Sequence, residues 1–97
     1  MILSFSDPAT QDLFEGTPSS RVRRIPADLR RRALRCLDLL DLAESLEDLS
    51  SRRGLRLHKL SGDLEGFHSM RVNDQWRLIF RWTEHGSAAV RLIDYHR

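Results

Sequence analysis

The chain has 97 residues, of which 40% are hydrophobic and 31% are charged. A chain of this length forms one domain with a modest core, because it buries roughly 60–70% of the surface that its unfolded form exposes. No apolar run approaches the roughly 20 residues that span a bilayer, and residues 1–7 lack the features of a secretion signal. The only cysteine, Cys36, excludes an internal disulfide and a cysteine-based zinc cluster. We expect a single cytoplasmic domain over residues 1–97, with no membrane partner and with Cys36 buried.

The charges are distributed unevenly although the net charge is only +2. Residues 21–35 contain seven arginines and one aspartate, whereas residues 36–48 contain five acidic residues and no basic residue. We expect ion pairs between these blocks at helical spacing, such as Arg35 with Asp38. Residues 51–97 contain nine basic and five acidic residues, an excess of four positive charges. Phosphate chemistry is therefore expected in the C-terminal half of the chain.

The first quarter of the chain predicts a strand and a short helix. Residues 2–6 have the composition of a short strand. Asp7 followed by a proline is typical of a helix start, so a helix is predicted through Phe14, with Gly16 ending it. Residues 17–25 form a polar connection that carries arginines.

A longer helix begins near Pro26, which Asp28 follows in the expected first turn. Apolar residues recur at intervals of three or four along it, which predicts a stripe that lies on a sheet. The stripe consists of Leu29, Ala33, Leu34 or Leu37, Leu40 and Leu42.

Strands dominate the remainder of the chain. We predict strands over residues 55–60, 66–72, 76–82 and 88–96, because alternating or β-favouring runs are bounded there by polar and glycine-containing turns. The turns cover residues 61–63, 73–75 and 83–87. The fold class is therefore α+β, with the layout β-α-α-β-β-β-β and a mostly antiparallel sheet.

Strict alternation over residues 76–82 separates a core face from an arginine face. Trp76, Leu78, Phe80 and Trp82 lie on the core face. Arg77 and Arg81 lie on the other face, where they could bind phosphates, and the preceding strand adds Arg71 or His68 depending on register. The alternative is that these arginines only solvate the outer face of a one-sided sheet.

Three residues are candidates for acid-base and electrostatic chemistry: His58, Lys59 and His96. An imidazole takes and gives a proton near neutral pH, and lysine or arginine stabilises charge on a phosphoryl group. Such a set suffices to cleave RNA through its 2′-hydroxyl without a metal. For His68 and His85 a structural role is favoured. The sequence lacks phosphate-loop, zinc-protease and serine-hydrolase motifs, so no metal or other cofactor is expected.

Several runs in the C-terminal half carry a resemblance to a known family. Leu57–Asp63, Gly66–Phe80 and the final Asp94–His96 resemble the HigB-type toxins of the RelE superfamily, and most of all their GraT-like branch. The Ile-x-Ser-Phe start and the Asp-Leu-Phe of the first helix also resemble this family, so the likeness spans nearly the whole chain.

This resemblance implies a RelE-like fold and the toxin of a type II toxin-antitoxin system. Such a toxin enters the A site of the 70S ribosome and cuts translated mRNA, leaving 2′,3′-cyclic phosphate and 5′-hydroxyl ends. The resemblance also implies a HigA-like helix-turn-helix antitoxin, which inhibits the toxin and links it to operator DNA.

The resemblance also assigns residue roles. Arg77 would bind the scissile phosphate, and His58 would act beside it as an acid, a base or a phosphate ligand. Asp94, Tyr95 and His96 would support proton transfer and stacking on an RNA base. Some relatives have a lysine where this chain has Ser61, so either the cationic role would pass to Lys59 or Arg71 or the activity would be weaker. The residues expected to bind RNA or phosphate are Lys59, Arg71 and Arg81.

Two alternatives remain open on the sequence alone. A non-catalytic module could bind nucleic acid through the arginines of residues 21–35 and of the sheet, with an affinity that falls steeply with salt. A protein-interaction domain could instead dock a partner through its acidic and basic helix blocks.

Overall fold

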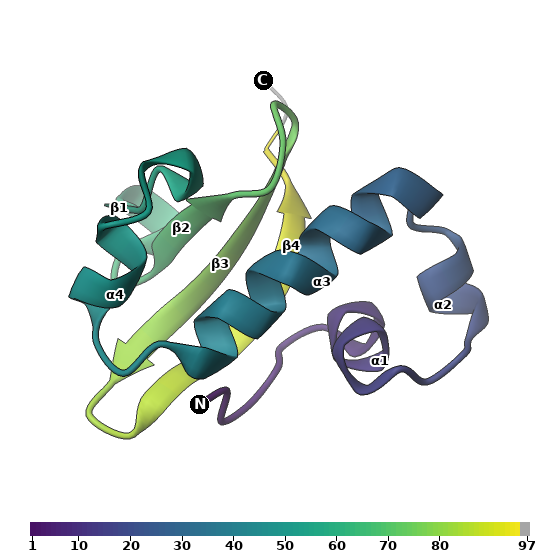
Figure 1. Cartoon of the computed structure of the whole chain (residues 1–97), viewed down its shortest axis with the longest axis horizontal. Helices are drawn as coiled ribbons and strands as arrows, with labels where there is room; N and C mark the ends of the chain where they lie inside the picture. The colour runs from purple at the N-terminus through teal and green to yellow at the C-terminus, as the bar shows by residue number, and fades with distance from the viewer. Residues whose placement is uncertain (96–97) are drawn as a thin grey trace.

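The computed structural model of the chain describes residues 1–95. It contains a four-stranded antiparallel sheet, and helix α3 lies across one face of this sheet (Figure 1). The strands follow chain order: β1 His58–Lys59, β2 His68–Arg71, β3 Trp76–Thr83 and β4 Gly86–Asp94. The helices are α1 Pro8–Glu15, α2 Ser20–Arg23, α3 Ala27–Leu42 and α4 Leu46–Ser50, with short 3-10 turns at η1 Arg53–Leu55 and η2 Gly62–Leu64. The α+β class is confirmed. No helix of residues 1–95 has the length and apolar character to cross a membrane.

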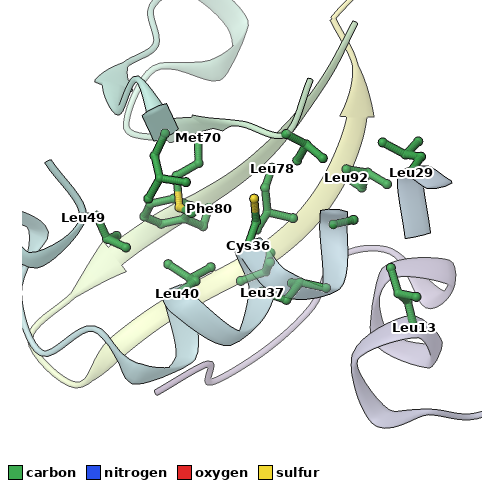
Figure 2. Close-up of a cluster of buried hydrophobic side chains, with 14 of the residues drawn as sticks. Leu13, Leu29, Cys36, Leu37, Leu40, Leu49, Met70, Leu78, Phe80 and Leu92 are labelled. Atoms are coloured by element: carbon green, nitrogen blue, oxygen red, sulfur yellow. The ribbon is translucent and has the colours of Figure 1, made fainter. Parts of the chain in front are cut away.

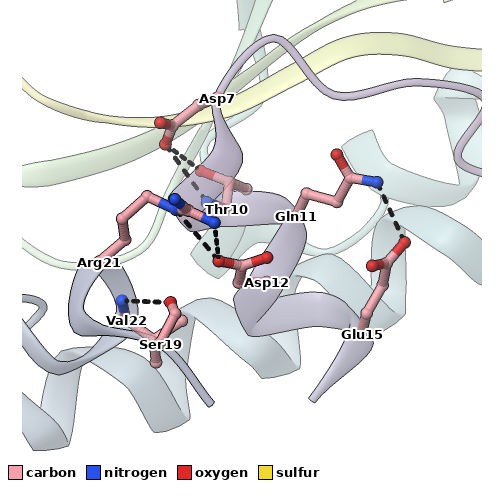
Figure 3. A network of polar contacts seen from close by, with 8 residues as sticks. All are labelled: Asp7, Thr10, Gln11, Asp12, Glu15, Ser19, Arg21 and Val22. Atoms are coloured by element: carbon pink, nitrogen blue, oxygen red, sulfur yellow. Dashed lines mark hydrogen bonds and ion pairs between the residues drawn. The ribbon is translucent and has the colours of Figure 1, made fainter. Parts of the chain in front are cut away.

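Helix α1 begins and ends where the sequence predicts. The Asp7 side chain accepts a hydrogen bond from the Thr10 backbone N–H, and Gly16 ends the helix with a left-handed φ of 74°. The sequence predicts only a polar connection over residues 17–25, but this segment contains α2, which Ser19 caps. Arg21 of α2 forms an ion pair with Asp12 of α1, with 2.8 Å between Nη2 and Oδ2; Figure 3 shows the two side chains facing each other. This pair and the serine cap stabilise a helix too short to be recognised by periodicity.

The main core lies between α3 and the sheet (Figure 2). The buried residues of α3 are Leu29, Ala33, Cys36, Leu37 and Leu40. Of the two alternatives Leu34 and Leu37, the structure buries Leu37. The prediction of a buried Cys36 is confirmed, but the prediction for Leu42 is wrong, because Leu42 is 76% exposed. Leu42 is two residues after Leu40, about 200° around the helix axis, so it projects away from the stripe, which continues at the buried Ala43.

The acidic residues after Cys36 do not pair with the arginine block as predicted. Among residues 1–95, Arg35 and Asp38 form no ion pair. Two of these acids instead accept hydrogen bonds from backbone N–H groups: Asp41 Oδ1 from Ile2 at 2.9 Å, and Asp48 Oδ2 from Glu44 at 2.8 Å. Asp48 belongs to the capping box of α4, a helix that was not predicted.

The expected first strand is reduced to two isolated parallel bridges to β4, Ile2 with Ser87 and Phe5 with Val90. The cause is an extra residue in β4, where the register of β3 and β4 shifts between Ile79 and Arg81. Ala89 has a left-handed φ of 53° there, and its backbone N–H donates to Ser4 Oγ. This bulge interrupts a continuous ladder with the N-terminal segment.

The predicted strand over residues 55–60 shortens to β1, because Arg56 adopts a left-handed φ of 46° after η1. The predicted turn over residues 73–75 is confirmed. It uses Asn73 in place of a glycine: the Asn73 side-chain oxygen accepts from the backbone N–H groups of Gln75 at 2.9 Å and Trp76 at 2.7 Å.

Candidate active site

The registers of three strands bring candidate site residues onto the sheet face opposite α3. His58 of β1 is opposite Ser69 of β2, and Arg71 of β2 is opposite Arg77 of β3. Residues that are opposite each other project to the same side of a sheet. Leu78 and Phe80 of β3 pack in the core beneath α3, so Arg77 lies on the other face. His58, Arg71 and Arg77 therefore share one face.

The Arg77 side chain is held in place from two directions. Its Nη1 donates a hydrogen bond to Ser69 Oγ at 2.8 Å, and its guanidinium carbon lies 5.4 Å from the centroid of the Tyr95 ring. Burial lowers the pKa of Arg77, an effect that Tyr95 opposes and that the nearby Arg71 and Arg56 charges reinforce. A guanidinium nevertheless stays protonated in a protein, so this position holds a partly desolvated positive charge. Such a charge attracts a phosphate strongly.

His58 is exposed, and its ring has a defined orientation. Nδ1 lies 3.1 Å from the Arg56 carbonyl oxygen. A carbonyl only accepts, so Nδ1 carries the hydrogen in this contact and the lone pair of the neutral ring is on Nε2. This carbonyl belongs to Arg56, whose backbone has the left-handed φ of 46° described above. This arrangement leaves Nε2 available to accept a proton.

Lys59 lies on the other face of β1 from His58. It is opposite His68, which in turn is opposite Phe80 on the core side of β2. The His68 ring stacks on Phe80 with centroids 5.9 Å apart. Burial lowers the pKa of His68, and the Lys59 charge lowers it further. The register thus places Arg71, and not His68, beside Arg77, in keeping with the structural role favoured for this histidine.

Arg71 forms an ion pair with the exposed Asp74. The hydrogen bond from the Arg71 side chain is the main reason that the pKa of Asp74 is lowered. The charges of Arg56 and Arg32 lower this pKa further. These three arginines therefore act on one exposed carboxylate.

Arg81 lies apart from this group, four residues beyond Arg77 in the same strand. Its guanidinium carbon is 4.3 Å from the centroid of the Phe67 ring. Gly66 has a φ of 93°, and a Cβ there would lie 2.5 Å from Arg81 Nη1. The glycine therefore allows the guanidinium to approach the chain before β2.

The residues at the end of β4 are divided between the two faces. Asp94 is opposite Trp76, and its carboxylate accepts from Gln75 Nε2 at 3.0 Å. Tyr95 lies beside Arg77, while the His96 prediction falls outside the described residues. Ser61 is exposed in the loop before η2. Of the predicted site residues, the structure brings together His58, Arg71, Arg77 and Tyr95.

Sequence reasoning did not single out Ser69. This serine is fully buried in β2 and contacts Arg77. A small polar residue between His68 and Met70 was the only signal, and its meaning depends on the register with β3. Among residues 1–95, no three histidine, cysteine or acidic side chains lie together in a way that could hold a metal ion.

Comparison with known proteins relates this geometry to a family. Residues 3–96 match the sequence profile described as the RelE-like toxin of type II toxin-antitoxin system HigB. The chain belongs to the HigB family of RelE-like toxins. It is 37% identical over 97 residues to Toxin HigB-1 of Vibrio cholerae, covering all of this chain and 99% of the relative. It is 33% identical over 101 residues to Endoribonuclease HigB of Proteus vulgaris, covering 99% of this chain and all of the relative.

A solved structure supports the RelE-like fold of this HigB-family chain. The YoeB/ParE toxin from Agrobacterium tumefaciens superposes with a TM-score of 0.50 at 17% identity, over 99% of this chain and 98% of the other. The predicted RelE-like fold is thus confirmed, while the GraT-like branch stays a prediction. Membership in a toxin-antitoxin family also implies an antitoxin partner.

Proposed function

We propose that this HigB-family toxin is an mRNA endoribonuclease that acts in the A site of the translating 70S ribosome, and therefore in the cytoplasm. The observation that carries the proposal is the shared sheet face of Arg77, His58 and Tyr95, with Arg77 fixed by Ser69 and by the Tyr95 ring. The name of the Proteus vulgaris relative, Endoribonuclease HigB, supports the same reaction class.

The chemistry needs a cation at the scissile phosphate, a base for the ribose 2′-hydroxyl and an acid for the leaving 5′-oxygen. We assign the cation to Arg77, whose charge is partly desolvated. His58 Nε2 and His96 are the two candidates for proton transfer. The attack of the 2′-oxygen on phosphorus breaks the bond to the 5′-oxygen, which leaves a 2′,3′-cyclic phosphate and a 5′-hydroxyl. No step in this scheme uses a metal ion or other cofactor.

The remaining predicted residues would contact the RNA around this centre. Tyr95 would stack on a message base, and Asp94 would support proton transfer from the neighbouring position. Arg71 and Arg81 would bind flanking phosphates, and Lys59 would do so from the opposite face of β1.

The test is to incubate the purified protein with ribosomes translating a defined message and to map the new RNA ends. We expect cuts at the A-site codon, with 5′ ends that require phosphorylation before ligation. The variant Arg77→Ala should lose these cuts. Equal cutting by the variant, or 5′-phosphate ends, would contradict the proposal.

We further propose that the antitoxin is a HigA-like helix-turn-helix protein, through which the toxin is held at operator DNA. Co-expression with the neighbouring gene should restore growth of cells that produce the toxin. The purified pair should bind the promoter DNA of the operon, whereas the toxin alone should not.

A further inference from the structure

A cavity of about 310 Å³ lies between α3, η1 and the end of β2. Its lining includes four arginines from three different parts of the chain: Arg32, Arg35, Arg52 and Arg71. Within residues 1–95, only Arg71 of these four has an ion-pair partner, Asp74. The cavity therefore concentrates three arginine charges that the described part of the protein does not neutralise.

The floor of this cavity is apolar. Cys36, Leu55 and Val72 line it and are each at most 7% exposed. Burial raises the pKa of the Cys36 thiol, so this side chain contributes a neutral surface. Cationic walls over an apolar floor match a nucleotide, because guanidinium groups bind the phosphate and stack on the base while the floor excludes water.

Arg71, the last residue of β2, is shared by the cavity and the candidate active site. This residue lines the cavity and is also opposite Arg77 in the ladder of β2 and β3. Arg32 on the cavity wall and Arg56 beside His58 both influence the carboxylate of Asp74. An RNA strand that extends from Arg77 around the end of β2 would therefore meet Arg71 before the cavity.

We propose that this cavity binds a flanking nucleotide of the same RNA strand whose scissile phosphate lies at Arg77. This inference rests on the proposed function, because it adds a second binding position to that substrate. It assigns Arg35 and Arg52, which no earlier step uses, to contacts with the RNA phosphate. An acidic protein segment fits less well, because it would not explain why Arg71 both lines the cavity and is paired with Arg77 across β2 and β3.

The test measures binding of short RNAs to the purified full chain without ribosomes. The probes are fluorescein-labelled RNAs of two and six nucleotides, with 2′-O-methyl groups that prevent cleavage. The variant Arg35→Gln removes a cavity charge. The variant Arg31→Gln is its matched control, because Arg31 is also an exposed arginine of α3 but does not line the cavity. Neither arginine forms an ion pair within the described chain, so both variants should fold, which thermal unfolding would verify.

We expect Arg35→Gln to weaken binding of the six-nucleotide RNA roughly tenfold. The slope of log K against log salt should fall by about 0.7, the value for one lost phosphate contact on a single strand. The two-nucleotide RNA should bind both variants and the unmodified protein alike. Arg31→Gln should leave both RNAs unaffected.

Equal effects of the two substitutions, or an equal loss for both RNA lengths, would overturn the proposal. Either result would mean that the arginines attract RNA only through the overall positive charge of the protein and not through a contact in the cavity. If Arg35→Gln reduced cleavage only on ribosomes, the cavity would contact ribosomal RNA and the proposal would also be overturned. Failure of the proposed nuclease gives a different pattern. In that case the six-nucleotide RNA would show the expected dependence on Arg35, yet messages on ribosomes would remain uncut.

Discussion

The guanidinium carbon of Arg77 lies 5.4 Å from the centroid of the Tyr95 ring, which joins the start of β3 to the end of β4. On its other side, Arg77 donates to the hydroxyl of the buried Ser69. Two contacts from different strands therefore orient one cation. A preorganised charge of this kind stabilises a transition state without reorganising during the reaction.

Replacing Arg77 should distinguish its charge from its shape. We expect Arg77→Ala to reduce the rate of cleavage on ribosomes by roughly 10²- to 10³-fold, the range for losing one electrostatic contact to the transition state. Arg77→Lys should recover part of this loss, because lysine keeps the charge but lacks the planar fork. Single-turnover kinetics measure both rates, and Arg31→Ala serves as a distant control. A fully active lysine variant would show that charge alone matters.

Ser69 should affect cleavage only through Arg77. The Ser69→Ala variant removes the 2.8 Å hydrogen bond, and we expect a roughly tenfold lower rate with unchanged affinity for the ribosome. Combining it with Arg77→Ala should produce no further loss, because the two substitutions remove the same interaction. Independent losses that multiply in the double variant would disprove this positioning role.

Thr10 should contribute to stability through its hydroxyl. The side chain is fully buried, donates to Asp7 Oδ2 at 2.6 Å and accepts from the Leu92 backbone N–H at 3.0 Å. The near-isosteric Thr10→Val leaves that N–H without its partner, which should lower the free energy of unfolding by about 1–3 kcal/mol. Thr10→Ser keeps the hydroxyl and should lose about 1 kcal/mol through the missing methyl group. Urea denaturation compares them, and equal losses would contradict the bridging role.

Two leucines of α3 provide a matched test of the core. Leu37 is fully buried and Leu42 is 76% exposed. We expect Leu37→Ala to lower the free energy of unfolding by about 2–5 kcal/mol, because it removes buried methyl groups and leaves a cavity. Leu42→Ala should stay within about 0.5 kcal/mol of the unmodified protein. If urea denaturation showed similar losses for the two variants, Leu42 would have to be buried in solution, which would contradict its exposed position here.

His68 should make stability depend on pH. Its pKa in the folded chain is lowered by burial and by the Lys59 charge, and its Nδ1 has no hydrogen-bond partner within residues 1–95. The unfolded chain therefore binds more protons, so stability falls as the pH drops below about 6.5, the ordinary histidine value, toward the folded pKa. The variant His68→Leu should lose this component. Melting temperatures at pH 7.5 and 5.5 test it, and identical acid sensitivity of both proteins would refute the assignment.

Local chemistry explains which parts of the fold were predictable. The cap at Asp7, the left-handed Gly16 and the alternation of β3 depend on neighbouring residues, so the sequence predicts them correctly. Helices α2 and α4 were missed, because they contain only four and five residues and depend on capping by Ser19 and Ser45. Helices this short show too little periodicity to be recognised.

The candidate site also has some features that local sequence predicts and others that depend on tertiary structure. The residue types, and the separation of Arg77 from the core face of β3, follow from the sequence and its period of two. The choice of Arg71 over His68 as the neighbour of Arg77 depends on the register of β2 with β3, as does the role of Ser69. A shift of one residue would exchange the two faces of β2, and local sequence does not specify that shift.

The sequence by itself therefore determined the α+β class, the two caps of α1, the arginine face and the positive excess of residues 51–97. Only the tertiary structure decided which charges act together. It placed Asp41 where it accepts from the Ile2 backbone N–H, and it brought Arg52 to the same cavity as Arg32 and Arg35 of α3. The physical reason is distance: Asp41 is far from Ile2 along the chain, as Arg52 is from the two α3 arginines, and only tertiary packing brings them together.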